Sequence, residues 1–155
     1  MMKKLIVYYS RTGNTKKVAE ELANKLDSEA IEIIDEKDRS GGIGWIGAGK
    51  DALKKNFTTI KPILKDISKY DLIIIGTPIW AGKMTPALRT FIKNYKEKIK
   101  NYAVFTTAGS SSSESLFIEI KKLMGMESKI NSAFLSKEIK NNLSQKINEF
   151  CSRIK

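Results

Sequence analysis

The chain has 155 residues, is 41% hydrophobic and carries a formal net charge of +11. This length and composition predict one folded domain over residues 1–155 and argue against a disordered chain. The chain has no histidine and a single cysteine, Cys151, which excludes histidine-assisted serine or cysteine catalysis, an internal disulfide and a cysteine-ligated metal cluster.

The strand-like segments of the sequence are short and rich in apolar or β-branched residues. They span residues 3–9 (KKLIVYY), 30–35 (AIEIID), 71–76 (DLIIIG), 101–109 (NYAVFTTAG) and 130–136 (INSAFLS). The third segment is almost continuously apolar, which is typical of a central parallel strand that helices cover on both faces.

Helix-like segments lie between these strands. From Asn14 apolar residues recur every four positions, and residues 36–44 then predict a turn because they are rich in glycine and polar residues. Further helices are expected in part of 45–69 with a break at Pro62, from Thr85 or Pro86, over 115–124, and over 139–154. This alternation predicts a three-layer α/β domain, with a parallel sheet between two layers of helices.

Three loops are expected at the carboxyl edge of this sheet, which is where ligands bind in open α/β folds. They span residues 10–15, 77–83 and 107–113, and each is rich in small, polar or glycine residues. The coincidence of three such loops at one edge favours a ligand site that they build together.

The first of these loops, SRTGNT, has the composition of a phosphate site. Ser10, Thr12, Asn14 and Thr15 carry hydroxyl or amide groups, Gly13 permits close backbone approach, and the following helix presents free N–H groups and a positive dipole. The alternative is that Thr12 or Asn14 simply caps that helix. The sequence here lacks the spacing of a P-loop and the three-glycine dinucleotide fingerprint. It also lacks a cysteine nucleophile in this turn and aspartates for Mg²⁺ at this strand end.

Two of the loop sequences closely resemble those of the flavodoxin family. They are SRTGNT, followed by the helix KKVAEEL, and GTPIWAGKMTPALRTFI after the third strand. Ser10, Thr12, Gly13 and Thr15 match the fixed positions of the family's FMN phosphate loop. The resemblance covers essentially the whole chain and is to the short-chain type. It implies a doubly wound five-stranded parallel sheet of strand order 2-1-3-4-5, with FMN as the cofactor.

The resemblance also implies which residues contact FMN. The first loop would hold the phosphate, the second would lie against one flavin face, and the third would meet the pyrimidine end. The cofactor-binding residues implied in this way are Ser10, Arg11, Thr12, Gly13, Asn14, Thr15, Pro78, Ile79, Trp80, Ala81, Gly82, Thr107, Ala108, Gly109 and Ser110. It implies no catalytic residue and no metal ligand.

Within the second loop, Trp80 is the aromatic residue expected to stack on the flavin ring. A core tryptophan is the alternative, which the polar, glycine-flanked surroundings of Trp80 disfavour. Gly82 would let the peptide next to the flavin change orientation, or it would serve turn geometry alone. Lys83 is expected to be a solvated surface lysine, and Cys151 a structural residue of the closing helix.

Two departures from the family pattern bear on function. The third loop carries no aromatic residue for the other flavin face, which is then open or covered by Trp45 or another residue of 41–49. An open face would admit a hydride donor or a quinone, so an NAD(P)H-dependent flavin or quinone reductase is the alternative to a carrier that shuttles electrons between redox partners. The net charge of +11 contrasts with acidic flavodoxins and favours a higher flavin potential and an acidic redox partner.

The charge does not by itself indicate a nucleic-acid partner. Lysines are spread along the whole chain without a recognition motif, and Arg11, Arg39 and Arg89 are scattered, so a non-catalytic basic binding module is only an outside alternative. The apolar runs are too short to span a bilayer, and residues 1–9 do not resemble a secretory signal. We therefore expect no membrane contact and a cytoplasmic location.

Overall fold

The computed structural model describes residues 1–37, 41–110 and 112–154, except for side chains at positions 41, 42, 45 and 51–53. The alternative that Trp45 covers a flavin face otherwise left open concerns a side chain outside this described part. Within the described part, no helix combines the length and the apolar character that crossing a bilayer requires.

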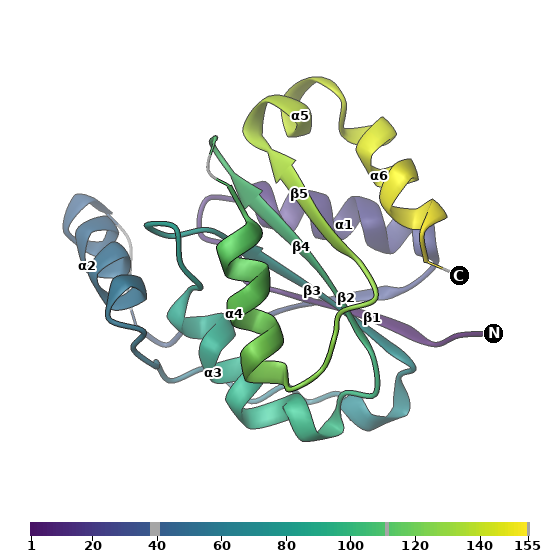
Figure 1. Cartoon of the computed structure of the whole chain (residues 1–155), viewed down its shortest axis with the longest axis horizontal. Coiled ribbons are helices and arrows are strands. Elements are labelled where there is room, and N and C mark those ends of the chain that lie inside the picture. Colours follow the sequence, from purple (N-terminus) through teal and green to yellow (C-terminus); the bar gives the residue numbers. More distant parts are fainter. Residues whose placement is uncertain (38–40, 111, 155) are drawn as a thin grey trace.

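In the described residues, five parallel strands form one sheet in the order β2-β1-β3-β4-β5 (Figure 1). Their bounds are Lys4–Tyr8 for β1, Glu29–Glu32 for β2, Leu72–Pro78 for β3, Tyr102–Ala108 for β4 and Asn131–Leu135 for β5. The predicted doubly wound parallel sheet and its strand order are therefore confirmed.

Helices cover both faces of this sheet (Figure 1). On one face lie α1 (Asn14–Leu26), α5 (Ser136–Asn141) and α6 (Leu143–Ser152), and on the other lie α3 (Pro86–Tyr95) and α4 (Glu114–Met124). The remaining α-helix, α2 (Gly41–Leu53), lies next to α3 at the edge of that second layer. Short 3-10 helices occupy Ile67–Lys69 and Lys96–Lys98. This arrangement has the three layers that the sequence predicts.

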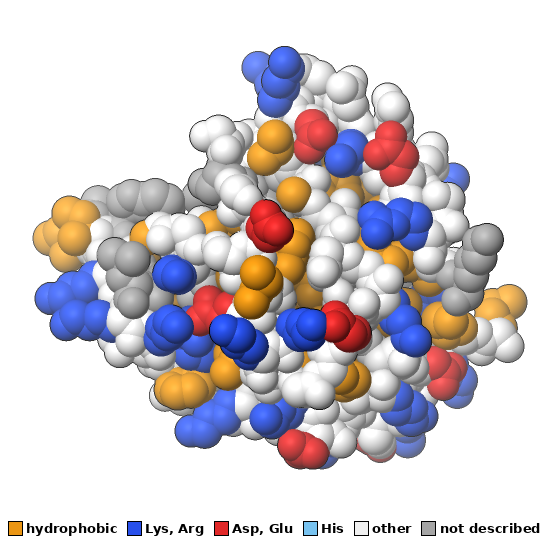
Figure 2. All heavy atoms as spheres, viewed as in Figure 1, with side chains coloured by type: hydrophobic (Ala, Val, Ile, Leu, Met, Phe, Trp, Pro, Cys, Tyr) orange, Lys and Arg blue, Asp and Glu red, His pale blue; other side chains and the backbone are white. Residues whose placement is uncertain are grey.

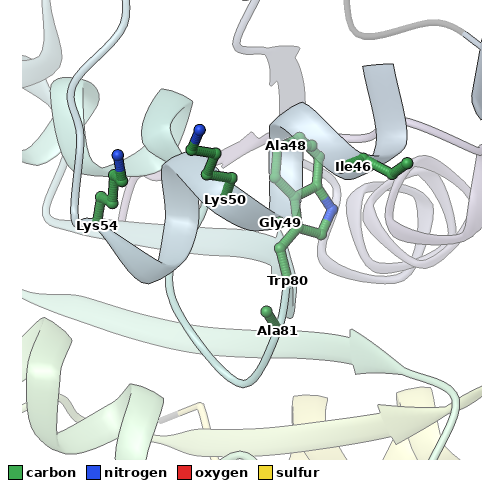
Figure 3. A pocket seen from close by; sticks show the side chains of 7 residues that line it. All are labelled: Ile46, Ala48, Gly49, Lys50, Lys54, Trp80 and Ala81. Carbon is green, nitrogen blue, oxygen red and sulfur yellow. The ribbon is translucent and has the colours of Figure 1, made fainter. Parts of the chain in front are cut away.

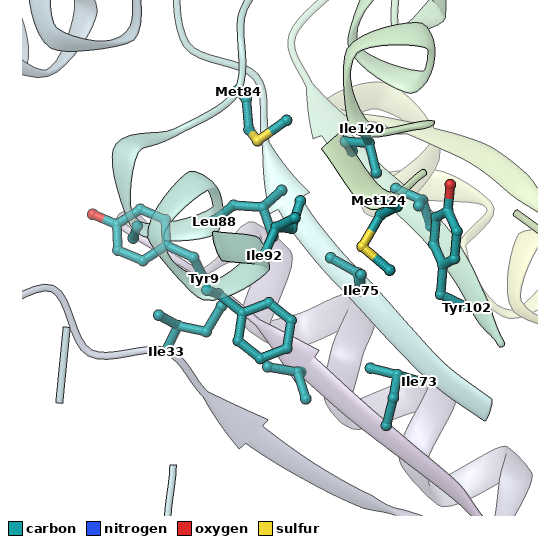
Figure 4. Packing of buried hydrophobic residues seen from close by; sticks show 14 of the residues in the cluster. Tyr9, Ile33, Ile73, Ile75, Met84, Leu88, Ile92, Tyr102, Ile120 and Met124 are labelled. Carbon is teal, nitrogen blue, oxygen red and sulfur yellow. The ribbon is translucent and has the colours of Figure 1, made fainter. Parts of the chain in front are cut away.

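Alternation along the strands divides the apolar side chains between two cores. In β3, Ile73 and Ile75 belong to the core under α3 and α4, whereas Leu72 and Ile74 belong to the core under α1 and α6. Figure 4 shows the first of these cores, where side chains of α3 and α4 pack toward Ile75. The apolar run of β3 is therefore buried on both faces, as predicted for a central strand.

Gly76 of β3 makes room for an aromatic ring in the second core. Its register partners are Tyr8 in β1 and Phe105 in β4. A Cβ atom at Gly76 would lie 2.6 and 2.8 Å from the Cε atoms of the Phe105 ring, and closer still to its Cζ atom. The ring of Phe105 also packs edge-on against Phe134, with 5.9 Å between centroids. This position therefore requires glycine for packing.

Two predicted elements differ from the structure. The turn predicted over 36–44 is partly wrong, because α2 begins at Gly41. Each helical glycine costs up to about 1 kcal/mol relative to alanine, and the burial of Ala48 in the core under α3 helps to offset that cost. The closing helix predicted over 139–154 is two helices, α5 and α6, because the backbone at Asn142 (φ −136°, ψ 25°) is not helical.

Candidate functional site

The three loops predicted to form a site do meet at the carboxyl edge of the sheet. The Oγ1 atoms of Thr15 and Thr107 lie 2.7 Å apart, and this buried hydrogen bond joins the first loop to the third. The N–H of Ile79 donates to the carbonyl of Thr107 over 3.1 Å and joins the second loop to the third. The site is therefore held together by hydrogen bonds between loops that are far apart in sequence.

In the first loop, the start of α1 is capped by Ser10. Its Oγ atom accepts hydrogen bonds from the N–H groups of Gly13 and Lys16, each over 3.2 Å. Gly13 has a φ of 100°, a left-handed conformation that glycine adopts without strain. The alternative that Thr12 or Asn14 caps this helix is therefore wrong.

This cap leaves several polar groups of the first loop available to a ligand. The side chains of Thr12 and Asn14 are exposed and make no hydrogen bond to any residue in the described part of the chain. The N–H groups of Thr12, Asn14 and Thr15 likewise have no acceptor there. Free N–H groups at a helix N-terminus favour an anion.

The second loop contains a tight turn next to Trp80. The N–H of Trp80 donates to the carbonyl of Lys83 over 3.1 Å, and the N–H of Lys83 donates back over 2.8 Å. Ala81 (φ 49°) and Gly82 (φ 72°) between them both have the positive φ of primed hairpin turns. Gly82 therefore has the positive φ that this tight turn requires, in line with the alternative that it serves turn geometry.

Trp80 combines a loop position with a buried side chain. It lies in the β3–α3 loop, as predicted, but it is only 3% exposed and belongs to the core under α3 and α4. Its ring packs edge-on against Tyr9, with 5.4 Å between centroids and 80° between planes. The polar, glycine-flanked sequence around Trp80 therefore correctly predicted its position in a loop, but it did not predict that its side chain is buried.

The third loop presents small residues. Ala108, Gly109 and Ser110 carry no bulky side chain, and the hydroxyl of Ser136 at the start of α5 donates to the carbonyl of Ala108 over 3.3 Å. At the base of this loop, the hydroxyls of Thr106 and Ser113 lie 2.6 Å apart and are both buried.

A cavity of about 150 Å³ lies where the three loops meet, and we call it the loop cavity. Its lining residues come from all three loops and from α5. They are Arg11, Thr12, Asn14, Thr15, Pro78, Ile79, Trp80, Thr107, Ala108, Gly109 and Ser136.

Most of the predicted site residues therefore surround one cavity. Ser10 and Gly13 do not line the cavity but determine the conformation of the first loop. The other predicted residues that do not line it are Ala81, Gly82 and Ser110. Ser136 was missed, although it directly follows the fifth strand and so belongs to the same sheet edge.

A larger cavity of about 550 Å³ lies between α2 and the second loop (Figure 3), and we call it the α2 cavity. On one side it is lined by Ile46, Ala48, Gly49, Lys50 and Lys54. Trp80 and Ala81 line it from the second loop, so that Trp80 borders both cavities.

Tyr8, at the end of β1, is the residue near this edge whose pKa is most clearly displaced. Burial, together with the carboxylates of Glu32 and Glu20, raises the pKa of Tyr8 to about 12. Its hydroxyl therefore stays neutral at physiological pH.

Comparison with known proteins points to one family. The family model described as flavodoxin matches residues 3–150, and no curated protein matches the chain. A flavoprotein from Lactobacillus acidophilus NCFM, solved in complex with FMN, is 25% identical, with a TM-score of 0.76 over 90% of this chain and 97% of that one.

Two further solved structures share the fold at lower identity. A Bacteroides uniformis ATCC 8492 protein, described as a candidate flavoprotein, is 23% identical, with a TM-score of 0.81 over 97% of this chain and 98% of that one. The flavodoxin of Streptococcus pneumoniae TIGR4 is 18% identical, with a TM-score of 0.56 over 97% of this chain and 98% of that one.

Proposed function

Because the chain belongs to the flavodoxin family, we propose that it binds FMN at the loop cavity and shuttles electrons between redox partners. The observation that carries this proposal is the Thr15–Thr107 hydrogen bond of 2.7 Å, which joins the phosphate-type loop to the third loop beside one cavity. The similar Lactobacillus acidophilus flavoprotein, which was solved in complex with FMN, supports the choice of cofactor.

The donor set of the first loop fits the phosphate group of FMN. Thr12 and Asn14 offer side-chain donors at the loop cavity, and the N–H groups of Thr12, Asn14 and Thr15 have no acceptor among the described residues. Backbone N–H groups and a helix dipole together bind a dianion without a lysine. Ser10 would position this loop through its hydrogen bonds to Gly13 and Lys16.

The second and third loops offer surfaces that suit a flat ring. Among the residues that line the loop cavity, Pro78, Ile79 and Trp80 are apolar or aromatic, whereas Ala108 and Gly109 are small. Aromatic residues pack well against planar ring systems in offset or edge-on arrangements. When bound, FMN would supply the electron chemistry, and these residues would orient it and shield it from water.

A reductase that uses NAD(P)H is the second candidate function. It is favoured by one observation: Trp80 is the sole aromatic residue among the described residues that line the loop cavity. Where no second aromatic side chain covers it, one face of a bound flavin would be accessible to a nicotinamide or a quinone. A carrier and a reductase share the FMN site and differ in whether NAD(P)H reduces the protein directly.

The charge supports an acidic redox partner. The chain has 28 Lys and Arg residues against 17 Asp and Glu residues. Figure 2 shows basic side chains spread over the face that carries α2, α3 and α4. Opposite charges steer protein partners together and favour fast association.

We place the carrier in the cytoplasm and do not assign it a nucleic-acid or membrane partner.

Titration of flavin-free protein with FMN and with riboflavin tests the FMN site. Binding of one FMN per chain is expected, with riboflavin at least about a hundredfold weaker because it lacks the phosphate and loses charge-assisted hydrogen bonds of roughly 1.5–3 kcal/mol each. Quenching of flavin fluorescence gives both affinities. Protein that leaves FMN fluorescence unchanged would support a non-catalytic basic module instead.

A further inference from the structure

The α2 cavity has an apolar floor, of which only Trp80 also lines the proposed FMN site. Ala48 and Trp80 are 1% and 3% exposed, so both are fixed parts of the core under α3 and α4. Gly49 and Ala81 add small surfaces beside the indole ring of Trp80 (Figure 3). The volume of about 550 Å³ is within the usual range of roughly 300–1,000 Å³ for small-molecule sites. The volume and the apolar lining beside the indole ring of Trp80 suit a flat apolar molecule.

The wall formed by α2 is anchored to the rest of the domain. After α2, the N–H of Thr58 donates to the hydroxyl of Thr90 over 3.0 Å, and that hydroxyl donates to the carbonyl of Thr58 over 2.8 Å. Lys55 lies 3.8 Å from Glu119 of α4 and forms an ion pair with it. These contacts connect the segment that follows α2 to α3 and α4, and Ala48 packs α2 itself into the core under α3 and α4.

Two lysines give the α2 cavity a positive rim. Lys50 and Lys54 are four residues apart, and the N–H of Lys54 continues the helical hydrogen bonding to the carbonyl of Lys50 over 3.1 Å. This spacing places like charges side by side, and Figure 3 shows both ammonium groups on the same side of α2. Neither lysine has an acidic partner in the described part of the chain, and no described lining residue is acidic. A negatively charged group at this rim would relieve the repulsion.

We propose that the α2 cavity is a second binding site, which takes a flat apolar molecule carrying a negatively charged group. The ring system packs against Trp80 and Ala48, and the anionic group lies between Lys50 and Lys54. The site is distinct from the loop cavity, and Trp80 is the wall between them. This inference goes beyond the proposed function, because it requires neither FMN nor electron transfer.

Anthraquinone monosulfonate is a suitable probe because it is flat, apolar and anionic. Its binding is measured by quenching of tryptophan fluorescence in a Trp45→Phe background, in which Trp80 is the single remaining tryptophan. Saturable quenching is expected, with neutral hydroxymethyl anthraquinone binding several-fold more weakly. Binding of the anion should also weaken as salt is raised. No saturable binding, or equal affinity for the neutral probe, would overturn the proposal.

Two pairs of variants locate the probe. Gly49 lines the α2 cavity and a Cβ atom there meets no atom within 4 Å, so Gly49→Leu should fill the cavity and weaken binding at least about tenfold. Gly47→Leu is the matched control, since Gly47 is equally open but does not line the cavity. Equal losses in the two variants would contradict the assignment.

The charge at the rim is tested by Lys50→Gln combined with Lys54→Gln. Removal of both charges should weaken binding of the anion by about five- to tenfold, and should leave binding of the neutral probe unchanged. Lys17→Gln combined with Lys25→Gln removes the same charge from α1, far from the cavity, and should have little effect. Equal losses in both double variants would show a general charge effect and contradict a local anion site.

Addition of FMN separates this proposal from the proposed function. Probe binding that persists with FMN bound supports two distinct sites, whereas competition between FMN and the probe would overturn the second site. Probe binding in a protein that does not bind FMN would contradict the proposed function and leave the second site intact.

Discussion

Replacing Thr12 by glutamate is expected to weaken FMN binding by about a hundredfold or more. Thr12 is exposed, lines the loop cavity and lies just before the N-terminus of α1. A carboxylate about 4 Å from a phosphate charge costs up to about 4 kcal/mol near a protein surface. Riboflavin has no phosphate, so its affinity should change little. Titration of both flavins against the variant measures the difference.

The thermal stability of Thr12→Glu and a variant with the same charge change elsewhere are the two controls for this prediction. An acidic residue near a helix N-terminus interacts favourably with the helix dipole, so flavin-free Thr12→Glu should melt no lower than the original protein. Thr59→Glu makes the same charge change at an exposed position away from the loop cavity and should leave the FMN affinity nearly unchanged. Normal FMN affinity in Thr12→Glu, or an equal loss of riboflavin, would contradict a phosphate site in the first loop.

Replacing Gly76 by alanine is expected to destabilise the fold by about 3 kcal/mol, the upper range for overpacking a core. The added Cβ would lie within 3.0 Å of three carbons of the Phe105 ring. That ring is fully buried and also packs against Phe134 and Phe150, so it has little room to move. For a domain of this size the loss corresponds to a decrease in Tm of about 6–12 °C, which thermal unfolding measures.

A smaller partner should rescue this substitution. Phe105→Leu removes the ring that the new methyl group meets, so the two changes together should cost less than the sum of their separate effects. Gly47→Ala serves as the control, because a Cβ at Gly47 has no neighbour within 4 Å and alanine favours the helix. Additive costs in the double variant would show that Phe105 is not the origin of the destabilisation.

The sheet was predictable because its signals are local. The apolar run of β3 is buried on both faces, and the alternation of strands with helices admits few other arrangements. The place of the first loop at the carboxyl edge of the sheet was predictable for a similar reason, since this loop directly follows the first strand. Four of its residues do line the loop cavity.

Features that depend on tertiary contacts were not predictable. The helix α2 contains several glycines and packs Ala48 into the core under α3 and α4, a tertiary contact that the local sequence does not indicate. The buried Trp80 packs edge-on against Tyr9, which is distant in the sequence. The capping of α1 by Ser10 requires the left-handed turn at Gly13, which brings Ser10 within 3.2 Å of the N–H of Lys16, six residues further along the chain.

Anaerobic reduction of the FMN-loaded protein tests the carrier proposal most directly. Visible spectra are recorded while dithionite and, in a separate sample, NADPH are added. Reduction by dithionite in two separate one-electron stages, with no reduction by NADPH on the same timescale, is the result that we predict for a carrier. Rapid bleaching by NADPH in a single two-electron stage would contradict it and identify the protein as a reductase.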